Sequence, residues 1–266
     1  MADVIDFFVR DVENSSSVFI AAAEDTARDI LTAVNGDEYI SAGSIQSSIS
    51  SHEYDAGIFN MQLYDLINRY NSSTKDFAMP LLSLTEKNGE KTVEISGTAL
   101  FNSSRYREKI SKEQTVFLNI LYNRVSNSAL AYDYADGKMV SLNIVESETV
   151  RKVALENGFP VFSINVKMQA DISEISGGVS SAMEIAEIEK IELAGERYIE
   201  SETQKMTDTL YKRYNSDSVG LGRLIYISEK DYFRQNEKNL DSVLQNSRFK
   251  VEAEIEIRRI GHEFIT

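Results

Sequence analysis

The last part of the chain, residues 249–264, alternates between apolar and charged side chains. The apolar positions are Phe249, Val251, Ala253, Ile255 and Ile257. Successive side chains of a strand point to opposite faces, so the pattern predicts a strand with one buried face and one face in water. Such strands are typical of antiparallel and mixed sheets, because sheets covered on both faces have continuous apolar runs. The segment therefore disfavours a simple doubly wound nucleotide-binding fold.

Further strands are predicted by the same alternation. Residues 159–175 repeat it, with apolar side chains at the even positions 162–172, and this segment is our predicted partner for the closing strand. Residues 128–146 indicate a hairpin that turns at Asp136-Gly137, a strong two-residue turn signal. Residues 78–101 indicate two more strands around Asn88-Gly89, and we expect this hairpin to be a hinge between an N-terminal and a C-terminal part.

Helices are predicted where the apolar residues recur at helical spacing. Leu63, Leu66, Ile67 and Tyr70 indicate one helix, and Ser111 is the expected N-cap of another. A long helix is predicted over residues 181–214, with one apolar stripe. The stripe comprises Ile188, Ile191, Gly195, Tyr198, Met206 and Leu210. We expect this helix to cover the apolar faces of the strands, which gives an α+β fold with mixed or antiparallel sheets and two or more domains.

Composition excludes several classes of function. The 266 residues carry a formal charge of -14, with a pI near 4.7, which opposes nucleic-acid binding and spontaneous adsorption to anionic lipid. The chain has no cysteine, so disulfides, thiolate metal sites and a cysteine nucleophile are excluded. No stretch approaches the ~18 apolar residues of a membrane-spanning helix, and the first residues lack the order of a signal peptide. These features predict a chain that is soluble as written.

No catalytic, cofactor or metal residue is predicted. His52 and His262 are the only histidines, and neither lies in a metal-ligand pattern. Gly220, Gly222 and Arg223 could hold a phosphate at a helix start, but the Gly-x-Gly pattern follows a helix, and the dinucleotide fingerprint needs a preceding strand. We favour a helix-helix turn there, in which Ser216 or Asp217 caps the next helix.

The glutamates of the long helix are interpreted as a solvated face without any role in calcium binding or acid-base chemistry. They are Glu184, Glu187, Glu192, Glu196 and Glu200. The charged face of the closing strand is expected to lie in solvent or against a protein partner. Partner-binding residues stay unassigned.

Several segments, taken in order, resemble the Ger(x)C family, the C subunits of bacterial spore nutrient germinant receptors. The first is "DFFVRDVENSSSVFIAAAEDTARDIL" near the start, and the second is "GTALFNSSRYREKISKEQTVFLNIL". "SDSVGLGRLIYISEKDYF" resembles the family's Asp-x-x-Gly-x-Gly segment, and "FKVEAEIEIRRIG" resembles its closing strand. The chain departs from the family where a proline and a tryptophan usually follow the Gly-x-Gly helix, since it reads "EKDYFRQNEKNL" there.

The resemblance implies a division into residues 1–94, part of an N-terminal domain that is incomplete here, and residues 95–266, with the long helix 181–214 and the closing strand 248–259. It also implies a lipoprotein of sporulating bacteria of the Bacillales and Clostridia type, on the outer face of the spore inner membrane. The partners would be the A and B membrane subunits of the receptor. Family members carry a secretion signal and a lipidated cysteine, and both are missing from this chain.

Three hypotheses follow. The first is a non-enzymatic receptor subunit that acts in spore germination through protein contacts at the membrane surface. The second is an extracytoplasmic small-ligand-binding module with its pocket near residues 88–97, where the two parts of the chain would meet. The third is an enzyme that acts on a phosphorylated substrate through the turn from Gly220 to Arg223.

Overall fold

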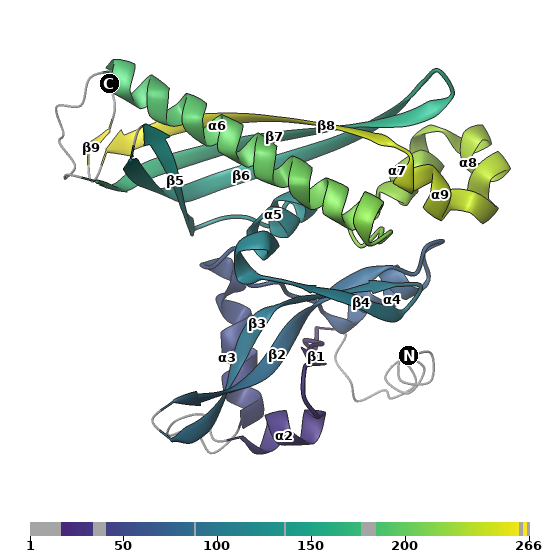
Figure 1. Ribbon diagram of the computed structural model, residues 1–266, viewed down its shortest axis with the longest axis horizontal. Coiled ribbons are helices and arrows are strands. Elements are labelled where there is room, and N and C mark those ends of the chain that lie inside the picture. Colours follow the sequence, from purple (N-terminus) through teal and green to yellow (C-terminus); the bar gives the residue numbers. More distant parts are fainter. Residues whose placement is uncertain are drawn as a thin grey trace. The chain divides into compact units, whose positions relative to one another are not determined.

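The fold is α+β and contains two mixed sheets (Figure 1). A computed structural model describes residues 17–33, 41–87, 89–135, 137–176, 185–260 and 263–264. The chain divides into two compact units. The first unit comprises residues 1–52, 57–115 and 210–245, and the second comprises residues 53–56, 116–209 and 246–266. The predicted fold class is confirmed, while the predicted domain boundary after residue 94 stays a prediction.

The first unit is built on a sheet with the strand order β1-β2-β3-β4. Its strands are β1 (Ala22–Ala23), β2 (Phe77–Lys87), β3 (Glu90–Asn102) and β4 (Arg105–Ile110). β1 runs parallel to β2, and the other pairs are antiparallel. The predicted hairpin between β2 and β3 is confirmed. Gly89 in its turn has φ 82°, a conformation that glycine adopts without strain. Asn88 lies outside the described residues.

Short helices complete the N-terminal part of the first unit. They are α2 (Ala27–Thr32), α3 (Ser41–Ser50), the 3-10 helix η1 (Ser51–Glu53), whose last residue belongs to the second unit, and α4 (Leu63–Tyr70). α4 buries Leu63 and Leu66 as its periodicity predicts. A separate cluster of buried side chains packs between the helices and the sheet: Ile30, Ile49, Ile58, Leu82 and Ile95.

A later segment of the chain returns to the first unit. It begins in the π-helical turn η2 (Thr209–Arg213) and continues through α7 (Leu221–Ser228), α8 (Lys230–Asn236), η3 (Glu237–Asn239) and α9 (Leu240–Gln245). The sequence predicts the first of these helices after the Gly-x-Gly turn, but it gives no sign that this segment belongs with strands about 100 residues earlier.

The helix α5 (Lys112–Tyr122) leads from the first unit into the second. The predicted cap at Ser111 is confirmed, because the Gln114 N–H donates to Ser111 Oγ at 3.3 Å and the Ser111 N–H donates to Gln114 Oε1 at 3.0 Å. This reciprocal arrangement is a capping box, which satisfies two backbone donors at once.

The second unit contains a sheet with the order β5-β6-β7-β8-β9. Its strands are β5 (Ser128–Ala135), β6 (Lys138–Glu156), β7 (Phe159–Ile175), β8 (Arg248–Ile260) and β9 (Glu263–Phe264). The predicted hairpin of β5 and β6 is confirmed, as is the pairing of the closing strand with residues 159–175. β7 and β8 run parallel in a register that stacks the rings of Phe162 and Phe249, with centroids 5.5 Å apart.

The long helix α6 (Ile185–Asp208) covers one face of this sheet (Figure 1). It is shorter than the predicted range 181–214, because the chain changes to the π-helical turn at Thr209, and residues 181–184 lie outside the described part. Gly195 allows the close approach, since a Cβ there would lie 2.5 Å from the Tyr132 hydroxyl and 2.7 Å from Ile255 Cδ1. The predicted apolar stripe is therefore the contact surface of the helix.

Candidate functional site

The Gly-x-Gly turn of the first unit is organised by Asp217. Its Oδ1 accepts hydrogen bonds from the Leu221 N–H at 2.6 Å and the Tyr211 hydroxyl at 2.7 Å, and its Oδ2 accepts one from the Gly222 N–H at 3.1 Å. A carboxylate that takes the free N–H groups of a helix start is a helix cap. The N-cap position of α7 is Gly220, and of the two residues predicted to cap the helix Asp217 supplies the capping carboxylate from three positions earlier, while Ser216 donates to the Phe101 carbonyl oxygen at 3.0 Å.

Arg69 of α4 lies against the same turn. Its guanidinium donates to the Val219 carbonyl oxygen at 2.8 Å. Gly220 has φ 85°, and a Cβ at this position would lie 2.0 Å from Arg69 Nη1. Glycine is therefore required twice, for its backbone conformation and for the space that the guanidinium fills. Gly222 is also confined, because a Cβ there would lie 2.9 Å from Asp217 Oδ2.

A second buried carboxylate, Asp76, directly precedes β2 and connects the Gly-x-Gly turn to the first sheet. Its Oδ2 accepts the Asp217 N–H at 2.7 Å, and its Oδ1 accepts the Ser103 N–H at 2.7 Å. Asn102 donates to Asp76 Oδ2 at 3.4 Å and to the Asn215 carbonyl oxygen. Burial raises the pKa of Asp76 to about 7, against the opposing effect of the two N–H groups and with a further increase from the charge of Asp217.

This geometry argues against a phosphate at the Gly-x-Gly turn and agrees with the favoured helix-helix turn, because the backbone donors are occupied. The N–H groups of Leu221 and Gly222, which a phosphate would need, already bind the Asp217 carboxylate, and the charge of Asp217 would repel an anion. Arg223 is exposed to solvent. We therefore interpret the Gly220–Gly222 segment as a structural joint of the first unit.

We expect Gly220→Ala to lower the free energy of unfolding by about 2 to 4 kcal/mol, because alanine is strained at this φ and its Cβ displaces the Arg69 guanidinium. Gly43→Ala is the matched control, since no heavy atom lies within 4 Å of a Cβ there and the site is helical. It should raise the free energy of unfolding by up to about 1 kcal/mol. Urea unfolding followed by circular dichroism gives both values, and equal effects would contradict the assigned role of Gly220.

Asp76 should make stability depend on pH. Its pKa of about 7 in the folded chain lies above the ordinary value of 3.8, so the folded state binds more protons between these pH values. The free energy of unfolding should therefore fall as the pH rises from about 4 through 7. Asp76→Asn should be less stable at acidic pH, because the NH2 group of asparagine cannot accept an N–H, whereas both oxygens of the protonated carboxyl group can. It should also show a shallower fall with pH, because asparagine does not titrate. Urea titrations of both proteins between pH 5 and 8 test this, and parallel curves would refute it.

His52 has a structural role. Its Nδ1 donates to the Ile49 carbonyl oxygen at 2.9 Å, so its Nε2 accepts the Asn60 side-chain amide at 2.9 Å. Both ring nitrogens are thereby used within the first unit. His262 lies outside the described residues. Within the ranges that the structure describes, no group of three or more His, Cys, Asp or Glu side chains could hold a metal ion.

The interpretation of the α6 glutamates as a solvated face is wrong for three of them. Glu192, Glu196 and Glu200 are half-buried, and each accepts a hydrogen bond from an N–H of β8. The donors are Ile257 at 2.8 Å, Ile255 at 3.2 Å and Ala253 at 3.1 Å, in that order. We call these residues the glutamate ladder. Glu187 instead pairs with Lys190 at 3.3 Å on the helix surface, and Glu184 is outside the described residues.

The ladder works because two periods match. Four residues of a helix advance by about 6.0 Å and two residues of a strand by about 6.6 Å, so every fourth helical side chain meets every second strand N–H. Helix and strand run in opposite directions, since the helix numbers rise as the strand numbers fall. Burial raises the pKa of Glu192, and the Ile257 N–H opposes that rise. The ladder thus occupies donors on the edge of β8 that faces away from β7.

Glu196→Met should lower the free energy of unfolding by about 1 to 3 kcal/mol, because it leaves the Ile255 N–H without an acceptor. Glu196→Gln keeps an acceptor oxygen and should cost less than about 1 kcal/mol. Replacing all three ladder residues with methionine should also promote self-association through the freed strand edge. Chemical unfolding and size-exclusion chromatography measure the two effects. Glu189→Met, at an exposed position of the same helix, is the control, and a loss there as large as at Glu196 would contradict the ladder's role.

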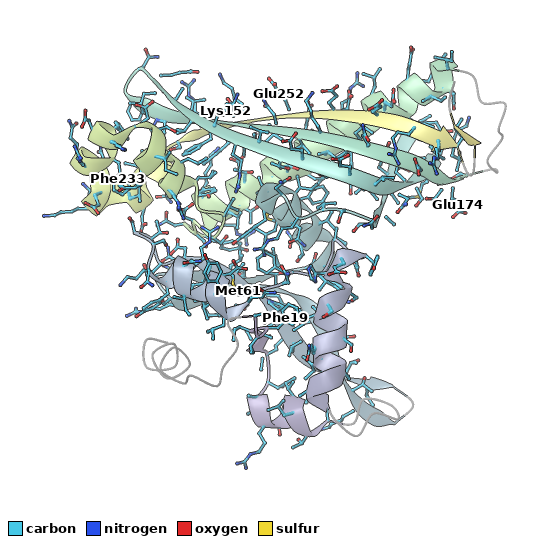
Figure 2. All side chains as sticks on the ribbon, turned by 180° about the vertical axis from the view of Figure 1, so that it is seen from behind. Phe19, Met61, Lys152, Glu174, Phe233 and Glu252 are labelled. Carbon is cyan, nitrogen blue, oxygen red and sulfur yellow. The ribbon has the colours of Figure 1, made fainter. Side chains whose placement is uncertain are left out.

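The other face of this sheet is open and charged. Its rows run across β6, β7 and β8, and Glu148, Lys167 and Glu254 form one of them. Lys167 Nζ lies 2.7 Å from Glu254 Oε2, and in the next row Gln169 donates to Glu256 at 3.0 Å. Figure 2 shows Lys152 and Glu252 along this sheet, with Glu174 toward its far end. A shallow hollow of about 290 Å³ lies over the acidic rows, lined by Glu146, Glu148, Lys167, Met168, Gln169, Glu254 and Glu256.

A cavity of about 480 Å³ lies in the first unit. Its lining is mostly apolar and comes from β1, α2 and α3, with Leu82 of β2. Ser17 and Gln46 supply its polar side chains. The lining does not include residues 88–97, where a pocket was predicted, so that pocket stays a prediction.

Comparison with known proteins finds one class of protein that matches most of the chain. Residues 1–84 match the model of the spore germination protein N-terminal domain, and residues 96–261 match that of the spore germination B3/GerAC-like C-terminal domain. The chain belongs to the spore germination B3/GerAC family. Within the ranges that the structure describes, no helix is long and apolar enough to cross a bilayer.

Two relatives agree with this placement. The chain is 22% identical over 260 residues to spore germination protein B3 of Bacillus subtilis (strain 168), an alignment that covers 97% of this chain and 69% of that protein. The crystal structure of the GerBC protein is similar with a TM-score of 0.72 at 20% identity, over 96% of this chain and 73% of that one. The GerBC similarity supports the fold.

Proposed function

We propose that this chain is a C-type subunit of a spore nutrient germinant receptor that acts without catalytic turnover, through protein contacts at the membrane surface. The observation that carries the proposal is the match of two germination-family domains, in order, to most of the chain. The occupied Gly-x-Gly turn supports the non-enzymatic part, because it removes the phosphate-binding interpretation. The partners we propose are the A and B membrane subunits of the receptor.

We assign the open face of the second sheet to partner contact. Its acidic rows, with Glu146, Glu148, Glu254 and Glu256, project charge on a surface that the strands hold rigid. Exposed ion pairs add little to stability, so the fold does not need these rows. Charges on such a surface fix the orientation and the rate of association with an oppositely charged partner.

The test is a co-purification from spores. The full-length protein, tagged and expressed in place of the native gene, should recover two membrane subunits from mild detergent, and deletion of the gene together with any redundant copy should abolish nutrient-triggered germination. Glu148→Lys with Glu254→Lys should reduce the recovered subunits at least tenfold. Glu189→Lys with Glu237→Lys makes the same charge change at exposed positions elsewhere and should recover them normally. Normal nutrient germination after deletion would refute the receptor function, and normal recovery by the first double variant would refute only the assigned face.

A further inference from the structure

The turn between β6 and β7 forms an apolar tip at one end of the open sheet. Asn157 and Gly158 have φ 52° and 82°, which makes a tight two-residue turn. Phe159 is 58% exposed and Leu155 36% exposed. The two residues lie on opposite faces of the hairpin, since Glu156 pairs with Phe159 and the alternation places Leu155 with the core positions. A hairpin with an apolar side chain on each face of its turn can insert into an apolar medium with the turn first.

Three cations lie behind this tip on the open face of the sheet. They are Lys152 on β6 and Arg248 and Lys250 on β8, and Glu156 is the carboxylate nearest the turn on this face. Arg151 pairs with Ile164 and points to the opposite face. These three cations and Glu156 together carry a charge of +2 in a chain whose formal charge is -14. Glu156 binds Arg248 at 2.9 Å and Lys250 at 3.3 Å, which holds the two cations beside the turn. We call these three cations, Leu155 and Phe159 the basic hairpin tip.

The cations lie at defined distances behind the tip. Arg248 is opposite Val161, and Lys152 and Lys250 are opposite Ser163. At about 3.3 Å per residue these rows lie roughly 7 and 13 Å along the strand from Phe159. If Phe159 reaches the hydrocarbon boundary, the first row lies at the depth of the headgroups, and the second lies within about one Debye length of their charge.

We propose that the basic hairpin tip docks this domain on an anionic lipid bilayer, with Phe159 and Leu155 entering the interface and the cations contacting the headgroups. Each cation near an anionic surface contributes about a fivefold increase in binding, and the apolar side chains add to it. The repulsion expected from the whole-chain charge is reduced at the tip, because Glu156 is paired with Arg248 and Lys250 and the other carboxylates of the open face begin at Glu252, one row farther along the strands. The proposal is independent of the proposed receptor function, since it concerns the purified chain and lipid alone.

The chain contains no tryptophan, so a single substitution gives a specific reporter. Phe159→Trp should shift its fluorescence emission to shorter wavelength on addition of vesicles that contain phosphatidylglycerol, and not with phosphatidylcholine vesicles. Leu193→Trp, at a position 50% exposed on α6 of the same unit, should show no shift. A shift that appears with rising protein concentration and without vesicles would instead assign the tip to a second copy of the chain and overturn the proposal.

Vesicle co-sedimentation of the otherwise unmodified chain supplies the second test. Lys152→Glu with Lys250→Glu should lower the apparent affinity for phosphatidylglycerol vesicles at least tenfold, and Phe159→Ser should lower it severalfold. Lys190→Glu with Lys205→Glu changes the charge equally on α6 and should leave the affinity within about twofold. Circular dichroism confirms that each variant is folded. Failure of the parent chain to bind these vesicles at low salt, or equal losses in both double variants, would overturn the proposal.

Discussion

A strand at the edge of a sheet presents a row of backbone N–H groups that no neighbouring strand pairs. β8 pairs on one edge with β7, in the parallel register that its alternation allows. On the other edge, the glutamate ladder supplies acceptors for alternate N–H groups. Unpaired edges invite association with other chains, so this arrangement protects the strand on which the second sheet closes. The covering helix therefore packs against the sheet and also completes its hydrogen bonding.

In the first unit, buried carboxylates bind backbone N–H groups that no strand or helix pairs. Asp217 accepts the N–H groups of a helix start, and Asp76 accepts the N–H groups of Ser103 and of Asp217 itself. A buried charge is costly without such bonds, and the raised pKa of Asp76 records that cost. These bonds fix the returning segment 210–222 against strands more than 100 residues earlier. A motif that resembles a phosphate loop in sequence is thus a joint in structure.

Alternation was sufficient to predict β2, β3 and β5 to β8 and the closing-strand pairing, because burial of one face imposes a period on the sequence, whereas the short strand β4 was not predicted. The same period does not reveal hydrogen bonds across elements. Glu192, Glu196 and Glu200 have the spacing of any solvated helical face, and only the position of β8 gives them another role. Asp217 was predicted as a cap because its bonds to the helix start are local in sequence. Its bond to Asp76 joins residues 141 positions apart and produces no recognisable sequence pattern.

Charge illustrates the same limit. The net charge of -14 averages over surfaces that the fold separates, and on that average the chain would avoid anionic lipid. Register places Lys152 and Lys250 on either side of Ser163 of β7. Two rows farther from the turn, it places Glu148 and Glu254 on either side of Lys167. Neither grouping is visible in the sequence, since β6 and β8 are about 100 residues apart. Because fields from exposed charges decay within about 10 Å in salt, a partner at either end meets the local charge and not the average.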